Sequence, residues 1–358
     1  DSGRCRLPGN RSAGSRSAAV ARCLRQEHTL VQLLGSLRQL ALAPSLEKVS
    51  FAGRGFAVAP SETSERLEAV PQAVVCGFEW GISAPDVRDV QRRLRLVDPE
   101  QRGFAYEGAT MAFTILDSVR GNRTAQLLSG AGERHIFLAY IGIGFAMARL
   151  PRPLWKKVLP DLTDSHYFPT MSWLAVDGYG FDKAYFDTER YVDRQTPIAP
   201  YPWDGDPDYF CRAIDQGIGR ALWFIHGADT GKVATAVAAF DRHRQADLWS
   251  GVGLAATFAG GGQPAELADL VQLAGEHAAE LALGSVFAVK ARTYAGYVPQ
   301  HTVSAAAEFT GLSVEQATEI ADSTEVLGPI SSSEPRYELW RQEIRSYFAR
   351  SGNRVATS

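Results

Sequence analysis

The chain has 358 residues, of which 45% are hydrophobic and 22% charged, and its formal net charge is -3 at pH 7. This composition is typical of a globular protein with a sizeable core, and it argues against a nucleic-acid or anionic-membrane partner. Four scattered cysteines without a CxxC pair favour a reducing cytoplasm, and no run of about 18 apolar residues is present to span a membrane.

The N-terminal region differs from the rest of the chain. Residues 1–26 carry six arginines and one acidic residue among many serines, glycines and alanines. We therefore predict a disordered basic tail over residues 1–41, a single helical-repeat domain over 42–350 and a short tail over 351–358.

The stretch YIGIGFAMARL, residues 140–150, comes close to a dinucleotide-binding fingerprint. Such a fingerprint needs a β-strand directly before it and an acidic residue about 20 positions later. The preceding GAGERHIFLAY has few β-branched residues, and prolines break the following PRPLWKKVLPDL. The stretch fails this test, so we expect no nucleotide cofactor, and nucleotide-dependent oxidoreductase chemistry is close to excluded.

The same small-residue pattern recurs along the chain at intervals of about 35 residues. The aligned glycines are Gly108, Gly144, Gly180, Gly219, Gly253 and Gly284. Small residues at positions i and i+4 share one face of a helix. A glycine inside a helix costs roughly 0.5–1 kcal/mol relative to alanine, so close packing between helices has to compensate for it.

Each repeat of this length has room for a second helix. The candidate segments are 153–163, 230–243, 302–310, the capped 313–322 and the amphipathic 334–350. No series of alternating strands is evident. The sequence predicts an all-α protein of tandem helical pairs, arranged as an α-solenoid or as a closed α/α toroid.

Polar and aromatic residues beside the repeat glycines are the candidates for a site. Weak candidates for catalysis are Glu107, Asp177, Arg220 and His226. Candidates for substrate binding are Tyr106, Tyr179, Trp223, Asp247, Trp249 and Arg292. On one concave wall they would form an aromatic pocket with a few charges. The alternative, which we favour for the set and more strongly for any single residue, is that the aromatics pack between helices and the charged residues form inter-repeat ion pairs.

Metal and nucleophile motifs are absent from the sequence. There is no HExxH, HxH or GxSxG, and a solvated helix face explains Glu276, His277 and Glu280. The acidic loop with Asp204, Asp206 and Asp208 is more typical of a turn and a helix cap than of a cation site. We expect neither a metal nor a cofactor.

An ordered set of motifs carries a resemblance over residues 42–325. The motifs are LAPSLEKVSFAGRGF, QRGFAYEGATMAF, LAVDGYGFDKAYF, GIGRALWF, DLWSGVGLAATFAGG and LGSVFAVKARTYAGYVPQHT. Together they resemble domain-of-unknown-function family 1702, found in actinomycete clusters with enediyne polyketide synthases. The resemblance implies an accessory role in enediyne-type biosynthesis and supplies no catalytic residues. The commoner family form DGYGFHEGYF has His and Glu where this chain has Asp182 and Lys183.

Three functions follow as expectations. The first is an accessory protein that binds or processes a hydrophobic polyene or enediyne intermediate. The second is a helical-repeat scaffold for a protein partner, such as the polyketide synthase or another accessory protein. The third, a minor one, is a cyclase or isomerase with Glu107 or Asp177 as acid, although the chain has no DDxxD or DxDD run.

Overall fold

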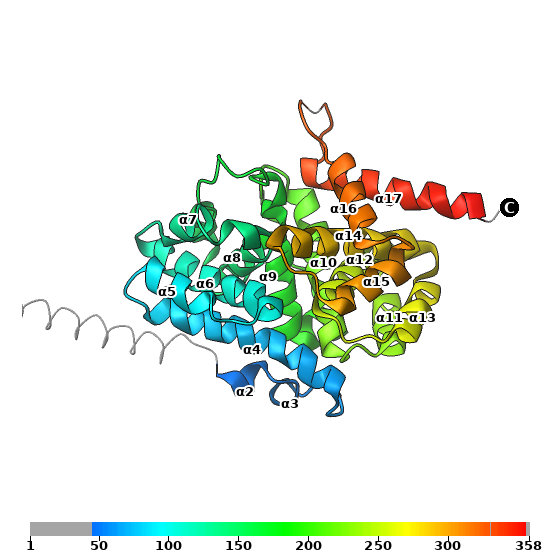
Figure 1. Ribbon diagram of the computed structural model, residues 1–358, viewed down its shortest axis with the longest axis horizontal. Coiled ribbons are helices and arrows are strands. Elements are labelled where there is room, and N and C mark those ends of the chain that lie inside the picture. Colours follow the sequence, from blue (N-terminus) through cyan, green and yellow to red (C-terminus); the bar gives the residue numbers. More distant parts are fainter. Residues whose placement is uncertain (1–44, 330, 356–358) are drawn as a thin grey trace, which may run out of the picture.

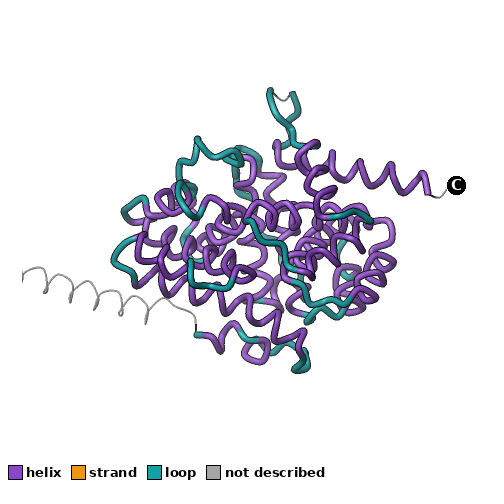
Figure 2. Tube along the Cα trace, viewed as in Figure 1, coloured by secondary structure: helices purple, strands orange, loops and turns teal. Residues whose placement is uncertain are grey.

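The computed structural model describes residues 45–329 and 331–355 (Figure 1). Within these ranges the chain consists of helices and loops without a β-strand, as Figure 2 shows, so the predicted all-α class is confirmed. The predicted basic tail over residues 1–41 lies outside the described residues. The last helix continues to Val355, beyond the predicted domain end at residue 350.

Seven helices follow one another in a row through the middle of the molecule. They are α4 (Glu62–Ser83), α6 (Pro99–Val119), α8 (Ile136–Met147), α9 (Trp173–Phe186), α10 (Pro207–Ile225), α12 (Arg242–Ala259) and α14 (Ala278–Ala295). Each of them packs against the next one along the chain. The repeat glycines all lie in these helices, as predicted.

Further helices connect and surround this row (Figure 1). They are α2 (Leu46–Val49), α3 (Phe51–Arg54), α5 (Val87–Leu94), α7 (Arg123–Leu128), α11 (Thr230–Ala238), α13 (Pro264–Ala274), α15 (Gln300–Thr310), α16 (Val314–Ser323) and α17 (Arg336–Val355). Single turns of 3-10 helix lie at Glu133–His135, Thr170–Ser172 and Gly275–His277, a longer 3-10 segment at Arg152–Lys157 and a π-helical turn at Glu189–Asp193.

The glycines allow the helix backbones to touch. A Cβ atom on Gly144 would lie 2.1 Å from the carbonyl oxygen of Ala175 in α9, and one on Gly178 would lie 2.4 Å from that of Ile141 in α8. Equivalent close approaches occur at Gly108, Gly142, Gly180, Gly217, Gly219, Gly251, Gly253 and Gly284. Gly142 and Gly144 are therefore helix-packing positions, and the stretch that looked like a nucleotide loop is a buried helix.

Two of the predicted second helices differ from the structure. The predicted helix over 153–163 is 3-10 helix only as far as Lys157, because the prolines in this stretch remove backbone donors. The predicted helix over 230–243 is two helices, with a break between Ala238 and Arg242. The predictions over 302–310 and 313–322 are confirmed, including the capping box of Ser313 and Gln316.

The beginning and the end of the row meet. Arg292 in α14 donates a hydrogen bond to the carbonyl oxygen of Glu100 in α6, at 2.8 Å. Thr63 in α4 donates to the carbonyl of Gly261, which follows α12, and the rings of Phe104 and Phe258 meet edge to face. Residues near the beginning and the end of the row are therefore in contact with each other.

Candidate functional site

Two cavities lie among the helices of the row, with volumes of about 80 Å³ and about 40 Å³. Val74, Met111 and Phe181 are among the residues around the larger one. Leu174, Phe258 and Phe287 are among those around the smaller one. Four residues line both cavities and so separate them: Phe104, Glu107, Arg220 and Phe224. Glu107 and Arg220, the two polar residues of this set, therefore lie between two cavities with mainly apolar and aromatic walls.

Glu107 is the unusual group at this boundary. It lies one residue before Gly108 on α6, and only 4% of its surface is exposed. Among the described residues its carboxyl group has no hydrogen-bond partner. Burial raises the pKa of Glu107 to about 8, because the favourable charge of Arg220 does not outweigh desolvation and Asp177 adds a repulsive charge. The Glu107 carboxyl is therefore mostly protonated at neutral pH.

Arg220 and Asp177 form a buried ion pair beside it. Arg220 Nε lies 2.6 Å and Nη2 2.5 Å from Oδ1 of Asp177. Burial raises the pKa of Asp177, while the adjacent Arg220 guanidinium acts in the opposite direction. The pair can form because Gly217 brings α10 against the Asp177 carbonyl of α9. Among the described residues Nε makes the one hydrogen bond of the Arg220 side chain, and the buried Nη2 has none, so donors of the guanidinium remain available.

The aromatic residues expected on the wall pack elsewhere. Tyr106 stacks on His135, Tyr179 packs against Trp155, and the Trp223 indole donates a hydrogen bond to the Gly260 carbonyl. Trp249 is buried on α12. None of the four tyrosine and tryptophan candidates lines either of the two cavities.

The remaining polar candidates also lie outside the cavities. Arg292 donates to the carbonyls of Glu100 and Phe258, with its guanidinium 3.8 Å from the Phe258 ring centroid. His226 follows the end of α10 half-buried, and burial lowers its pKa. The structure thus brings together Glu107, Asp177 and Arg220 but not the others.

Phenylalanines, rather than the tyrosines and tryptophans, form the cavity walls. Phe104 and Phe224 occur within the glycine-containing motifs. Their positions on helices of the row could therefore have marked them as candidates for the cavity wall. Asp182 is buried, lines only the larger of the two cavities and pairs with Arg149. Lys183 lies over the Tyr179 ring, with Nζ 5.3 Å from its centroid.

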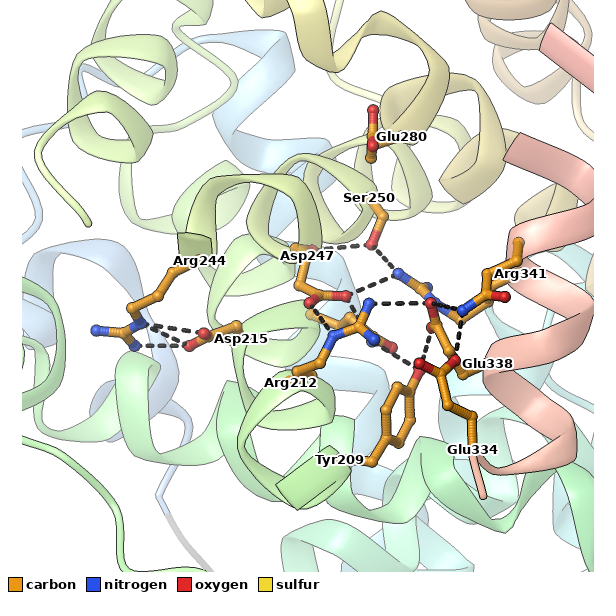
Figure 3. A network of polar contacts seen from close by, with 12 residues as sticks. Tyr209, Arg212, Asp215, Arg244, Asp247, Ser250, Glu280, Glu334, Glu338 and Arg341 are labelled. Carbon is orange, nitrogen blue, oxygen red and sulfur yellow. Dashed lines mark hydrogen bonds and ion pairs between the residues drawn. The ribbon is translucent and has the colours of Figure 1, made fainter. Parts of the chain in front are cut away.

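Asp247 belongs to a second, separate polar cluster that holds α17 (Figure 3). Glu338 of α17 accepts hydrogen bonds from Tyr209, Arg212, Arg341 and Arg345 at 2.8 to 3.1 Å. Arg341 also reaches Asp247 Oδ1 at 3.0 Å. We call Arg212, Asp247, Glu338 and Arg341 the α17 clamp. The surrounding guanidinium groups lower the pKa of Glu338 to about 2 despite its burial.

The acidic loop before α10 acts as a helix cap. Oδ1 of Asp206 accepts hydrogen bonds from the backbone N–H groups of Asp208 and Tyr209. Across the described residues, no three histidine, cysteine, aspartate or glutamate side chains converge as a metal-binding group. None of the helices described here is both long and apolar enough to cross a membrane.

Comparison with known proteins identifies the family. A family model described as "Protein of unknown function (DUF1702)" matches residues 33–348. The chain belongs to this family. No curated protein and no solved structure matches it significantly. The DUF1702 match includes every helix of the central row, the cavity residues and the α17 clamp.

Proposed function

We propose that this DUF1702 protein binds an elongated, apolar, unsaturated molecule in the two central cavities. The observation that carries the proposal is Glu107, an acid buried without a hydrogen bond between two aromatic spaces. A buried polar group without a partner costs free energy, and a ligand that supplied the partner would recover it. The resemblance to proteins of enediyne clusters favours a polyene or polyketide intermediate as the ligand, and hence an accessory role in that biosynthesis.

The size of the cavities sets a condition on binding. Spaces of about 80 and 40 Å³ hold only small groups of atoms. A longer ligand has to turn the rings of Phe104 and Phe224, which separate the cavities. Binding would therefore join the two spaces into one aromatic channel.

The proposal includes a finer description of the fold, a closed α/α toroid. The contacts of Arg292 with Glu100 and of Thr63 with Gly261 support closure, because they link the last helices of the row to the first. A closed ring of inner helices would give an enclosed ligand site rather than the open groove of a solenoid.

A second function, an acid-dependent isomerase or cyclase, is favoured by one observation. The protonated Glu107 is a proton donor in an apolar site, where a proton can be passed to an unsaturated or oxygenated ligand. A protein scaffold has less support, because the exposed large apolar side chains of the described chain come from separate segments, such as Leu46, Leu96, Val119 and Leu327.

Binding of 1,6-diphenylhexatriene, a neutral polyene that fluoresces in apolar surroundings, tests the proposal. We expect saturable binding of one probe per chain. Met111→Trp, which fills the larger cavity, should weaken binding about tenfold or more, whereas Val303→Trp on the exposed face of α15 should not. The thermal midpoints of both variants should be measured to check that they fold. If the probe does not bind, or if Met111→Trp binds as wild type does, the proposal is wrong.

A further inference from the structure

We propose that Glu107 and Arg220 recognise a neutral carbonyl oxygen near the middle of the ligand. This inference rests on the proposed function, and it adds the chemical class of the ligand. Both side chains line both cavities, so both reach the point where the cavities meet. A ligand that extends into the two cavities has to pass between these two groups.

The two groups present donors to this point. A protonated carboxyl group has one O–H donor, and a guanidinium has N–H donors only. Among the described residues the Glu107 carboxyl forms no hydrogen bond, and the Arg220 side chain donates from Nε alone while its buried Nη2 has no hydrogen-bond partner. Two donors that face one space are matched by an acceptor with two lone pairs. A carbonyl oxygen provides both lone pairs without bringing a donor of its own.

The charge balance excludes a carboxylate ligand. Arg220 is already neutralised by Asp177, at 2.5 Å. A ligand carboxylate would therefore add an uncompensated negative charge to an apolar interior, which is costly. The other charged groups at these cavities, Arg149 and Asp182, pair with each other and line only the larger one.

The walls of the cavities define the rest of the ligand. Apart from these polar groups and the Tyr185 hydroxyl, the side chains from α4, α6, α8, α9, α10, α12 and α14 that line the cavities are apolar. The ligand class is therefore a ketone or enone with an apolar, unsaturated arm on each side of the carbonyl carbon. Its oxygen would lie between Glu107 and Arg220.

A matched pair of probes tests this inference. One is 1,5-bis(4-dimethylaminophenyl)penta-1,4-dien-3-one, which has an unsaturated arm on each side of the carbonyl and whose absorption moves to longer wavelength when that carbonyl accepts hydrogen bonds. The other is its isostere with CH₂ in place of the carbonyl oxygen. We expect the ketone to bind about tenfold more tightly than the isostere and to shift to longer wavelength, since hydrogen bonds with charged groups are among the stronger ones.

Variants at Glu107 distinguish hydrogen-bond donation to the ligand carbonyl from a purely structural role of this residue. Glu107→Gln keeps a donor, so it should keep the preference for the ketone, whereas Glu107→Met should lose it. In the wild type the preference should fall as the pH rises above about 8, where the Glu107 pKa lies, and in Glu107→Gln it should not. Glu343→Met on the exposed face of α17 is the control.

The outcomes distinguish this inference from the proposed function. If neither the two probes nor diphenylhexatriene binds, the proposed function fails and this inference fails with it. If both probes bind equally and the ketone spectrum does not shift, the carbonyl inference is wrong while the apolar binding site stands. Equal preference in Glu107→Met and wild type would also overturn it.

Discussion

Two buried glutamates show how the surroundings of one residue type set its protonation. Glu107 has apolar neighbours and no hydrogen bond, and its pKa is raised to about 8. Glu338 is as deeply buried, but Arg212, Arg341 and Arg345 surround it, and its pKa is lowered to about 2. The first is a neutral acid at pH 7 and the second is a carboxylate. Only the first therefore has a proton to offer a ligand.

Replacing Glu107 by Gln should stabilise the protein above pH 4.5. A raised folded-state pKa means that stability is greatest below the ordinary glutamate pKa and falls as the pH rises to about 8. The variant lacks this loss, so its free energy of unfolding should exceed that of the wild type by roughly 3 kcal/mol at pH 7. Urea unfolding at pH 5, 7 and 8 measures this. Parallel pH profiles of variant and wild type would show that Glu107 is not buried as described.

At the scale of the helices, glycine sets the distance between neighbours. Carbonyl oxygens of one helix occupy the place that a Cβ atom would take on the next, as at Gly144 with Ala175 and at Gly217 with Asp177. Mid-helix glycine is unfavourable by itself, so the gain comes from close packing of the backbones. This packing brings Asp177 and Arg220 within reach of each other.

Gly144→Leu should damage folding by pushing α8 and α9 apart, and even Gly144→Ala should destabilise the protein by roughly 1–3 kcal/mol. The contact is with backbone, which has no rotamer to change. Gly231→Ala is the matched control, since a Cβ on this exposed α11 glycine meets only the Asp229 carboxylate at 3.6 Å. Circular dichroism measures the thermal midpoints of these variants and of the wild type. Equal midpoints for wild type and Gly144→Leu would disprove the packing role.

At the scale of the molecule, the last helix is attached by charges. In Figure 1, α17 lies against the body at its beginning and extends away from it toward the C-terminus. The α17 clamp joins its first turns to α10 and α12, and the buried Ile344 and Trp340 add apolar contacts. Residues more than 90 positions apart in the chain are thus fixed together, as Asp247 and Arg341 are.

Glu338→Gln should destabilise the protein by roughly 3–5 kcal/mol, because it leaves several buried or half-buried guanidinium groups without their carboxylate. A lowered folded-state pKa means that the Glu338 contribution is present above pH 4.5 and is lost as the pH falls toward 2. The wild type should therefore lose stability over this range more steeply than the variant. Glu343→Gln, exposed on the same helix, should match the wild type. A Glu338→Gln variant with wild-type acid stability would contradict the clamp.

The sequence by itself determined the helices that carry the repeat glycines and the positions where they touch. Both are local signals, since glycine spacing, caps and prolines act within one or two turns. Only the tertiary structure decided which candidates meet. Helices of the row such as α8 are buried on nearly every side, so no polar stripe marks the face toward the interior. For this reason Glu107, Asp177 and Arg220 could be proposed from sequence, but their convergence, and the packing roles of Tyr106, Tyr179 and Trp223, depend on how three separate helices are placed.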